Sequence, residues 1–155
     1  MTVPPADKSI LKDLKTVGIT EVAFNIEIFD RAIARAIMPG KGTIPIQSYF
    51  SVLEKAVELW GRTGAVRSMV IVGLEPVASL FSGLETLARM GVQPILSPFG
   101  PRPETELAQY IPFGTETLIW IFKQAVDICR PYGLRPGPDN LNGQNNTLSL
   151  PAAWL

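Results

Sequence analysis

The chain has no histidine and a single cysteine, Cys129, among its 155 residues. Without histidine, this stretch of chain has no Ser-His-Asp or Cys-His machinery and no histidine-based metal site. One cysteine also excludes an intrachain disulfide and a CxxC pair of metal ligands. Cys129 lies in an apolar helical pattern, so we expect a buried structural thiol rather than a reactive one.

Charge is scarce and balanced. Lys plus Arg and Asp plus Glu number 14 each, so the net charge is zero and no basic field attracts nucleic acid or an anionic membrane. No apolar run approaches the roughly 20 residues of a membrane span, and the first residues lack the regions of a signal peptide. We therefore expect a cytoplasmic protein that binds neither nucleic acid nor membrane.

The length favours one domain, which we expect at residues 1–133, followed by a Pro-, Gly- and Asn-rich tail at 134–155. Hydrophobic residues make up 46% of the chain and charged residues 18%. This composition is apolar for a chain that stands alone. We therefore expect another domain or chain to cover part of its surface.

Three times, a helix-like segment ends in glycine and runs into a strand-like segment. The expected strands are 21–28, 66–72 and 92–97, and the second reads as buried on both faces. The expected helices are 10–17, 29–38, 47–60, 78–90 and 115–130, with a loop at 41–45 and a short helix at 104–110. Helices that alternate with strands at this spacing predict parallel strands and an α/β fold.

Three parallel strands leave both edges of a sheet open, and only Pro94 protects either of them. A closed (β/α) barrel needs eight strands. The fold class predicted is therefore a partial (β/α) barrel with about three parallel strands. We expect a homodimer or a barrel-completing chain at 22–28 or 92–97, unless the apolar end of the tail, 148–155, covers one edge.

Polar side chains lie at or just after the ends of the expected strands: Asn25, Glu27, Glu75 and Ser97. Ligands bind at the carboxyl ends of strands in parallel α/β folds, so we expect these side chains to converge there. Each also has a structural reading. Glu27 can be a solvated or salt-bridged carboxylate, and Glu75 can be a first-turn acid favoured by the helix dipole. Gly73 can serve a tight turn or the close approach of a ligand.

The ordered set FNIE, PGKGTIP, VRSMVIVGLEP and LARMGVQPILSPFGPRPETELA resembles the C-terminal half of radical S-adenosylmethionine (radical SAM) enzymes. The biotin-synthase-like branch is the nearest, and the similarity spans roughly Lys8 to Gln109. Such enzymes bind a [4Fe-4S] cluster through a CxxxCxxC loop early in the barrel. The cluster reduces S-adenosylmethionine to a radical that abstracts a substrate hydrogen.

The resemblance implies which residues face S-adenosylmethionine. Asn25 and Glu27 match the polar residues of the fourth barrel strand, near the ribose or the methionine part. The fifth-strand motif, near adenine, falls on Val72, Gly73 and Glu75, although Gly73-Leu74-Glu75 follows the usual glycine pattern only loosely. The end of the sixth strand, also near adenine, falls on Ser97, Pro98 and Phe99.

The chain departs from the family in lacking the three cluster cysteines and the first three strands. One hypothesis is that it is the S-adenosylmethionine-binding half of a radical SAM enzyme, with the cluster on a missing half or a partner. A second is a non-catalytic α/β association module that keeps the fold. A third, a fragment of an aldolase-like barrel, lacks a strand-end lysine for Schiff-base chemistry, since Lys41 and Lys55 fall in a loop and a helix. The substrate stays unknown.

Overall fold

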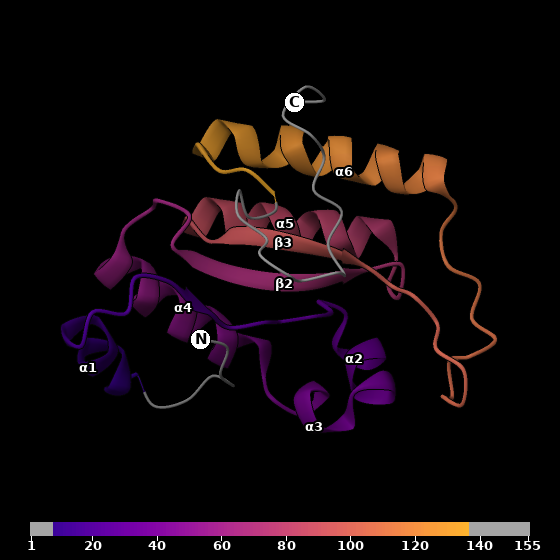
Figure 1. Cartoon of the computed structure of the whole chain (residues 1–155), viewed down its shortest axis with the longest axis horizontal. Helices are drawn as coiled ribbons and strands as arrows, with labels where there is room; N and C mark the ends of the chain where they lie inside the picture. The colour runs from indigo at the N-terminus through magenta and orange to yellow at the C-terminus, as the bar shows by residue number, and fades with distance from the viewer. Residues whose placement is uncertain (1–7, 137–155) are drawn as a thin grey trace.

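The computed structural model describes residues 8–136. Helices and strands alternate along the chain as expected, with two short additional helices (Figure 1). Their bounds are α1 (Ile10–Thr16), β1 (Val22–Ala23), α2 (Arg31–Ile37), α3 (Pro39–Gly42), α4 (Ile46–Trp60), β2 (Val66–Val72), α5 (Val77–Met90), β3 (Gln93–Pro98), α6 (Thr115–Cys129) and the 3₁₀ helix η1 (Arg130–Tyr132).

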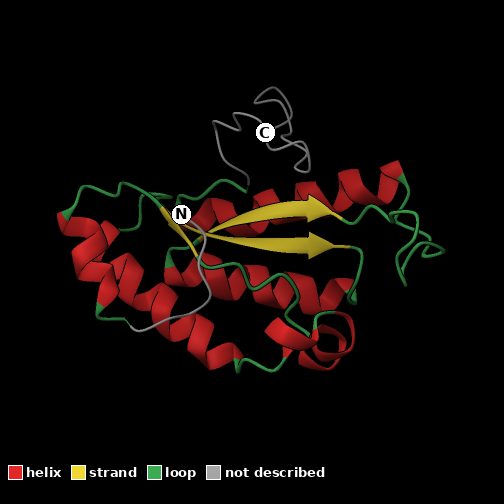
Figure 2. Ribbon diagram, turned by 60° about the horizontal axis from the view of Figure 1, so that its bottom comes forward, coloured by secondary structure: helices red, strands yellow, loops and turns green. Residues whose placement is uncertain are grey.

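The three strands form one parallel sheet in the order β1-β2-β3. Figure 2 shows the two long strands pointing the same way, toward one end of the molecule. This arrangement confirms the predicted partial α/β barrel. Pro94 lies in β3, at an edge of the described sheet, where a residue without an N–H group is tolerated.

Both crossover helices lie on the same face of the sheet. Val66, Val70 and Val72 of β2 are buried in one apolar core with residues of α4 and α5. The alternate β2 residues, Arg67, Met69 and Ile71, are only half-buried. The expectation that this strand is buried on both faces is therefore wrong, because α4 and α5 cover the same side.

The first strand is shorter than the predicted span of 21–28. Regular pairing with β2 covers only Val22–Ala23. Further along the chain, a single bridge pairs Glu27 with Val70. Val22 pairs with Val66, so the chain advances five residues beside four of β2. One extra residue in a strand is a β-bulge, and it interrupts the ladder here.

Two other predicted segments differ. The segment 41–45 was expected to be a loop, but its first residues belong to the four-residue helix α3. Pro39 begins this helix, where its missing N–H costs no bond. The helix expected at 104–110 is wrong: this segment forms turns, and Glu104 has a φ of 64°, which is incompatible with a right-handed helix.

Helix α1 carries an apolar stripe that is not wholly covered. Leu11 is buried, whereas Ile10 and Val17 are 44% and 74% exposed. The helix was predicted correctly, and it packs on α4. The apolar tail end at 148–155, expected to cover a sheet edge, lies outside the described residues. No helix within residues 8–136 has the length and apolarity to cross a bilayer.

Candidate functional site

The carboxyl ends of β2 and β3 lie side by side. In the parallel register, Ile71 is opposite Ser97 and Val72 is opposite Pro98. The amide of Phe99 extends the ladder by donating to the carbonyl of Val72 at 2.8 Å. The structure thus brings together five predicted site residues at this edge: Val72, Gly73, Ser97, Pro98 and Phe99.

Gly73 ends β2 in a conformation that suits glycine, with a φ of 112°. Its carbonyl accepts a hydrogen bond from the hydroxyl of Tyr110. The Tyr110 ring meets the ring of Phe99 edge to face, with centroids 5.4 Å apart. A Cβ added at Gly73 would meet Phe113 and Phe99 at 3.7 and 3.8 Å, an ordinary contact. The segment from Phe99 to Phe113 therefore borders this edge of the sheet.

The side chains of Asn25 and Ser68 accept hydrogen bonds from backbone amides that the bulge beside β1 leaves unpaired. The Asn25 side-chain oxygen accepts from the amide of Met69 at 3.1 Å, and the Ser68 hydroxyl accepts from the amide of Ile26 at 3.2 Å. Each satisfies a backbone donor that an uninterrupted ladder would have paired. Asn25, predicted to face a ligand, thus uses its side-chain oxygen within the fold and keeps its NH₂ group for other contacts.

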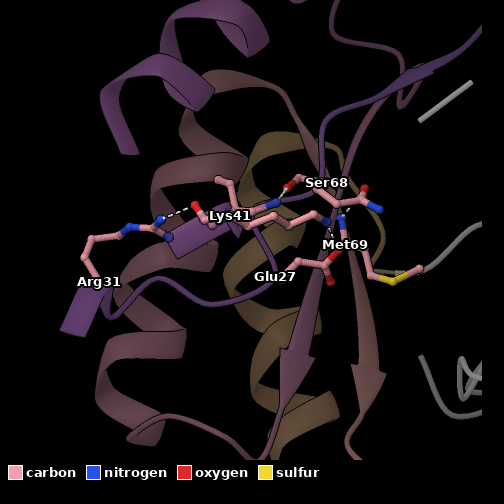
Figure 3. A network of polar contacts seen from close by, with 7 residues as sticks. Glu27, Arg31, Lys41, Ser68 and Met69 are labelled. Atoms are coloured by element: carbon pink, nitrogen blue, oxygen red, sulfur yellow. Dashed lines mark hydrogen bonds and ion pairs between the residues drawn. The ribbon is translucent and has the colours of Figure 1, made fainter. Parts of the chain in front are cut away.

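Glu27 pairs with Lys41 of α3. The Lys41 ammonium lies 2.6 Å from the Glu27 carboxylate, and Figure 3 shows it reaching from α3 toward Glu27. Glu27 itself has a φ of 68°, in the left-handed region that few non-glycine residues adopt. Its amide donates to the Met69 carbonyl, and its carbonyl accepts from the Ile71 amide. Of the structural interpretations of Glu27, the salt-bridged carboxylate is therefore the one found here.

Arg31 holds α3 in place beneath this pair. Its guanidinium donates to the carbonyls of Ile28, Lys41, Gly42 and Ile44 at 3.0 to 3.2 Å. Figure 3 shows its side chain directed at the backbone of Lys41. A guanidinium presents five donors in a rigid fork, which suits it to gather several carbonyls. Arg31 therefore fixes the backbone from which Lys41 extends.

Tyr49 of α4 lies near these charges. Its side chain is buried, and its hydroxyl has no hydrogen-bond partner among the residues that the structure describes. Burial raises the pKa of Tyr49, and the positive charges of Lys41 and Arg31 oppose that rise. An unpaired buried hydroxyl is unfavourable, so this cluster contains one hydrogen bond that residues 8–136 leave unmade.

Glu75 is buried at the start of α5 and binds three donors. Its carboxylate accepts from the amides of Phe29 and Asp30 at 3.1 and 2.9 Å, and from the Ser79 hydroxyl at 2.8 Å. Asp30 in turn caps α2 by accepting from the amides of Ala32 and Ile33. Glu75 therefore ties the start of α2 to the start of α5.

The predicted site residues that follow β2 and β3 share one end of the sheet, whereas Asn25 lies beside the middle of β2, and the polar groups have separate partners. Asn25 binds the amide of Met69, Glu27 binds Lys41, and Glu75 binds the segment before α2. Ser97 is buried opposite Ile71. Their joint contact with one ligand stays a prediction.

A cavity of about 420 Å³ lies between the C-terminal half of α2 and the segment that follows β3. Its walls are largely apolar, and Arg102 and Glu106 add charge at the rim. The lining residues are Ala36, Ile37, Phe99, Gly100, Arg102, Thr105, Glu106 and Leu107. Phe99 connects this cavity to the edge formed by Val72 and Gly73.

Cys129 is fully buried in α6, and burial raises the pKa of its thiol to about 12. This placement confirms the expected structural thiol. Within residues 8–136, no three His, Cys, Asp or Glu side chains gather closely enough to hold a metal ion. A [4Fe-4S] cluster therefore has no ligand set on the described part of this chain.

Sequence reasoning missed four residues of this region: Lys41, Tyr49, Ser68 and Tyr110. Ser68 left a signal, because a hydroxyl in a largely apolar strand needs a partner when buried. Tyr49 lies at helical spacing with other apolar residues of α4, which indicates packing and leaves its hydroxyl unremarked. Lys41 and Tyr110 reach their partners across the fold, and no spacing in the sequence indicates those contacts.

No family model matches the chain, but comparisons with known proteins find a curated relative and solved structures that are similar to it. Over 130 residues, or 83% of the chain, it is 25% identical to bacteriochlorophyllide c C-7(1)-hydroxylase of Chlorobaculum limnaeum. Its structure is similar to that of coproporphyrinogen III oxidase from Escherichia coli, described as a radical SAM enzyme. That match has a TM-score of 0.67 at 16% identity and covers 90% of this chain.

The chain spans about a third of either protein, 32% of the hydroxylase and 35% of the oxidase. The structural match shows that the chain has the fold of part of a radical SAM enzyme. This match supports the fold that the resemblance implies.

Proposed function

We propose that this chain is the S-adenosylmethionine-binding half of a radical SAM enzyme of the biotin-synthase-like branch, completed by a half that bears the cluster. The carrying observation is the shared edge of β2 and β3. There, one parallel register gathers Val72, Gly73 and the segment Ser97–Phe99 in a fold shared with part of a radical SAM enzyme. Such an edge is where parallel α/β folds bind ligands.

The residues at this edge suit different parts of S-adenosylmethionine. Backbone groups and apolar side chains at Val72, Gly73 and Phe99 suit a flat adenine ring. Polar groups at Asn25 and Glu27 suit the ribose or the methionine part. Glu75 stabilises the fold next to this edge, since its carboxylate accepts hydrogen bonds from the backbone amides of Phe29 and Asp30, just before α2.

The cluster does not fit this chain. Its one cysteine is buried, and three cysteine ligands are required by the CxxxCxxC loop of the family it resembles. The cluster therefore belongs to the missing half or to a partner. Bound there, it would supply the electron that converts S-adenosylmethionine to a radical, and this chain would position the S-adenosylmethionine.

The two similar proteins have names that contain bacteriochlorophyllide and coproporphyrinogen, both tetrapyrroles. A tetrapyrrole is accordingly the substrate class that we propose for the completed protein. The half-exposed face of β2, formed by Arg67, Met69 and Ile71, would then face the interior of the completed barrel.

Calorimetric titration of the purified chain with S-adenosylmethionine tests the binding role. We expect saturable one-to-one binding, with free methionine as the control that should not bind. A chain that binds neither S-adenosylmethionine nor 5′-methylthioadenosine at millimolar concentration would contradict the proposal.

A second candidate, a non-catalytic association module, is favoured by the internal partners of Asn25, Glu27 and Glu75. Such a module needs a partner at its open sheet edges, as a homodimer or with another chain. Sedimentation distinguishes the two candidates. If the chain is an association module, we expect stable self-association without ligand. If it is half of an enzyme, we expect that a cysteine-bearing half is required to form a barrel that cleaves S-adenosylmethionine.

A further inference from the structure

One wall of the cavity beside α2 is the segment that follows β3, and the fold holds this segment at both ends. At its start, the amide of Phe99 donates to the Val72 carbonyl at 2.8 Å. Further along, the Tyr110 hydroxyl donates to the Gly73 carbonyl. Between these two contacts, Leu107 packs in an apolar cluster with residues of α2. A wall held in this way needs little ordering when a ligand enters.

The size and the lining of this cavity suit one edge of an apolar ring system. Its volume of about 420 Å³ lies in the range of roughly 300–1,000 Å³ that is typical of ligand pockets. Ile37, Phe99 and Leu107 supply apolar walls. A whole tetrapyrrole with its side chains is larger than this space. The cavity therefore has room for one edge of such a macrocycle, and the remainder would extend beyond the rim.

Two charged side chains line the rim without counter-ions. Arg102 and Glu106 are both exposed. Within residues 8–136, neither side chain takes part in an ion pair or a hydrogen bond. The backbone of Arg102 is nevertheless held, because its carbonyl accepts from the Thr105 hydroxyl at 2.8 Å. A guanidinium binds a carboxylate through two parallel hydrogen bonds, so Arg102 can bind an acidic group on a ligand in this cavity.

We propose that this cavity binds one edge of the tetrapyrrole substrate, with the Arg102 guanidinium on a propionate carboxylate of that substrate. This inference rests on the proposed function, which supplies the substrate class. Tetrapyrroles such as coproporphyrinogen carry propionate side chains on an apolar macrocycle, and apolar walls with an arginine at the rim match both parts. Phe99 lines the cavity and also borders Gly73. The substrate would therefore lie next to the edge proposed for S-adenosylmethionine, as hydrogen abstraction requires.

The two rim charges should affect binding in opposite directions. Arg102→Gln removes the cation, so the dissociation constant of an anionic tetrapyrrole should rise about fivefold. Arg102→Lys keeps the charge but loses the planar fork, and should weaken binding less. Glu106→Gln removes a like charge, so binding should tighten about twofold. A purely structural role of this segment would not produce opposite effects from the two substitutions.

The test is a fluorescence titration with coproporphyrin III, which is stable in air and carries four propionates. Ala36→Trp fills the cavity from α2, where Ala36 is exposed, and should raise the dissociation constant more than about tenfold. The matched control is Ala32→Trp, an exposed position of the same helix that does not line the cavity. This control should leave coproporphyrin III binding unchanged. All variants should bind S-adenosylmethionine as the unaltered chain does.

If Ala36→Trp does not fold, NMR of the unaltered chain replaces it. The ring current of the bound macrocycle should shift the methyl resonances of Ala36, Ile37 and Leu107, and leave those of α1 unchanged. Shifts at α1 without shifts at these three residues would overturn the inference.

The outcomes separate this inference from the proposed function. If coproporphyrin III binds the unaltered chain, and Ala36→Trp and Arg102→Gln bind it equally well, the inference is wrong. It is also wrong if the chain binds S-adenosylmethionine but not coproporphyrin III. In both cases the proposed binding of S-adenosylmethionine stands. If coproporphyrin III binds with the expected changes and S-adenosylmethionine does not bind, the proposed function fails and the assignment of the cavity stands.

Discussion

Glu27 and Glu75 both follow a strand at the same end of the sheet, yet the structure treats them differently. Glu75 is 5% exposed and binds two backbone amides and a hydroxyl. Glu27 binds one lysine side chain that is itself 42% exposed. A position at the end of a strand does not show whether an acid has a structural role. The partners of the two acids differ in kind, because backbone amides cannot leave and a lysine side chain can.

The surroundings of Glu75 and of Glu27, here called the Glu75 half and the Glu27 half of the edge, differ in the same way. The Glu75 half is built into the fold, since it connects α2 to α5 and leaves no donor free for exchange. The Glu27 half combines a bulge, a residue in the left-handed region and the Tyr49 hydroxyl, which has no hydrogen-bond partner within residues 8–136. Strained backbone and unpaired polar groups gather at functional sites more often than elsewhere. We therefore expect ligand exchange at Glu27 and not at Glu75.

The largest effect should come from Glu75→Ala, which leaves the amides of Phe29 and Asp30 buried without their acceptor. Hydrogen bonds to a charged group contribute about 1.5–3 kcal/mol each, so the free energy of unfolding should fall by about 3 kcal/mol or more. Urea denaturation measures it. Glu75→Gln, which keeps an acceptor, should lose less. A loss below about 1 kcal/mol for Glu75→Ala would show that these amides find other partners.

A smaller loss in the free energy of unfolding is expected for Gly42→Ala. This variant tests whether α3 has a fixed position against α2. The new Cβ would overlap the Ala34 carbonyl, a backbone group that cannot turn away. Overpacking of this kind costs about 1–3 kcal/mol, and Lys41 should lose its place beside Glu27. Gly40→Ala is the control, because nothing lies within 4 Å of a Cβ there. Equal stability of both variants would mean that α3 can shift.

Cys129 is far from both acids in the sequence, and its thiol tests the burial of the core. Burial raises its pKa from 9.0 to about 12. The folded state thus keeps the proton longer than the unfolded state does. This contribution to stability is complete below pH 9 and is lost as the pH rises toward 12, by about 1.4 kcal/mol per pH unit. Denaturation at pH 8 and 10, compared with Cys129→Ala, measures it. Rapid labelling of the thiol at pH 8 without denaturant would contradict its burial.

The smallest effect should be the coupling between Glu27 and Lys41. A double-mutant cycle with Glu27→Gln and Lys41→Met should give about 1 kcal/mol, since one partner is half-exposed. The cycle for the exposed pair Lys55–Glu58 should give about 0.5 kcal/mol or less. A Glu27–Lys41 coupling above about 3 kcal/mol would identify a fixed structural pair, and exchange by a ligand would then be unfavourable.

Local patterns were enough to predict much of the fold. The β-branched run of β2 was predicted with its observed bounds, and α5 and α6 differ by one residue at one end. These elements have strong periodicity and end near glycine or a turn. The bulge beside β1 could not be predicted, because it depends on the hydrogen bonds that the Asn25 and Ser68 side chains accept from backbone amides of the neighbouring segment. Alternating polarity continues unchanged through the bulge.

The candidate site was predictable in position but not in contacts. Strand ends in a parallel sheet share one edge, which placed Val72, Gly73 and Phe99 together. The partners of Glu27 and Glu75 come from α3 and from the segment before α2, elements whose placement follows from tertiary packing. The sequence left a structural and a functional reading open for each acid, and the contacts favour the structural one most clearly for Glu75.

The most direct test of the account is an NMR titration of the ¹⁵N-labelled chain with S-adenosylmethionine. The account predicts saturable shifts of the amides of Glu27, Gly73 and Phe99, with those of α1 and α6 unchanged. An absence of shifts at millimolar ligand, or shifts confined to α1 and α6, would contradict the assignment of this edge as the S-adenosylmethionine site.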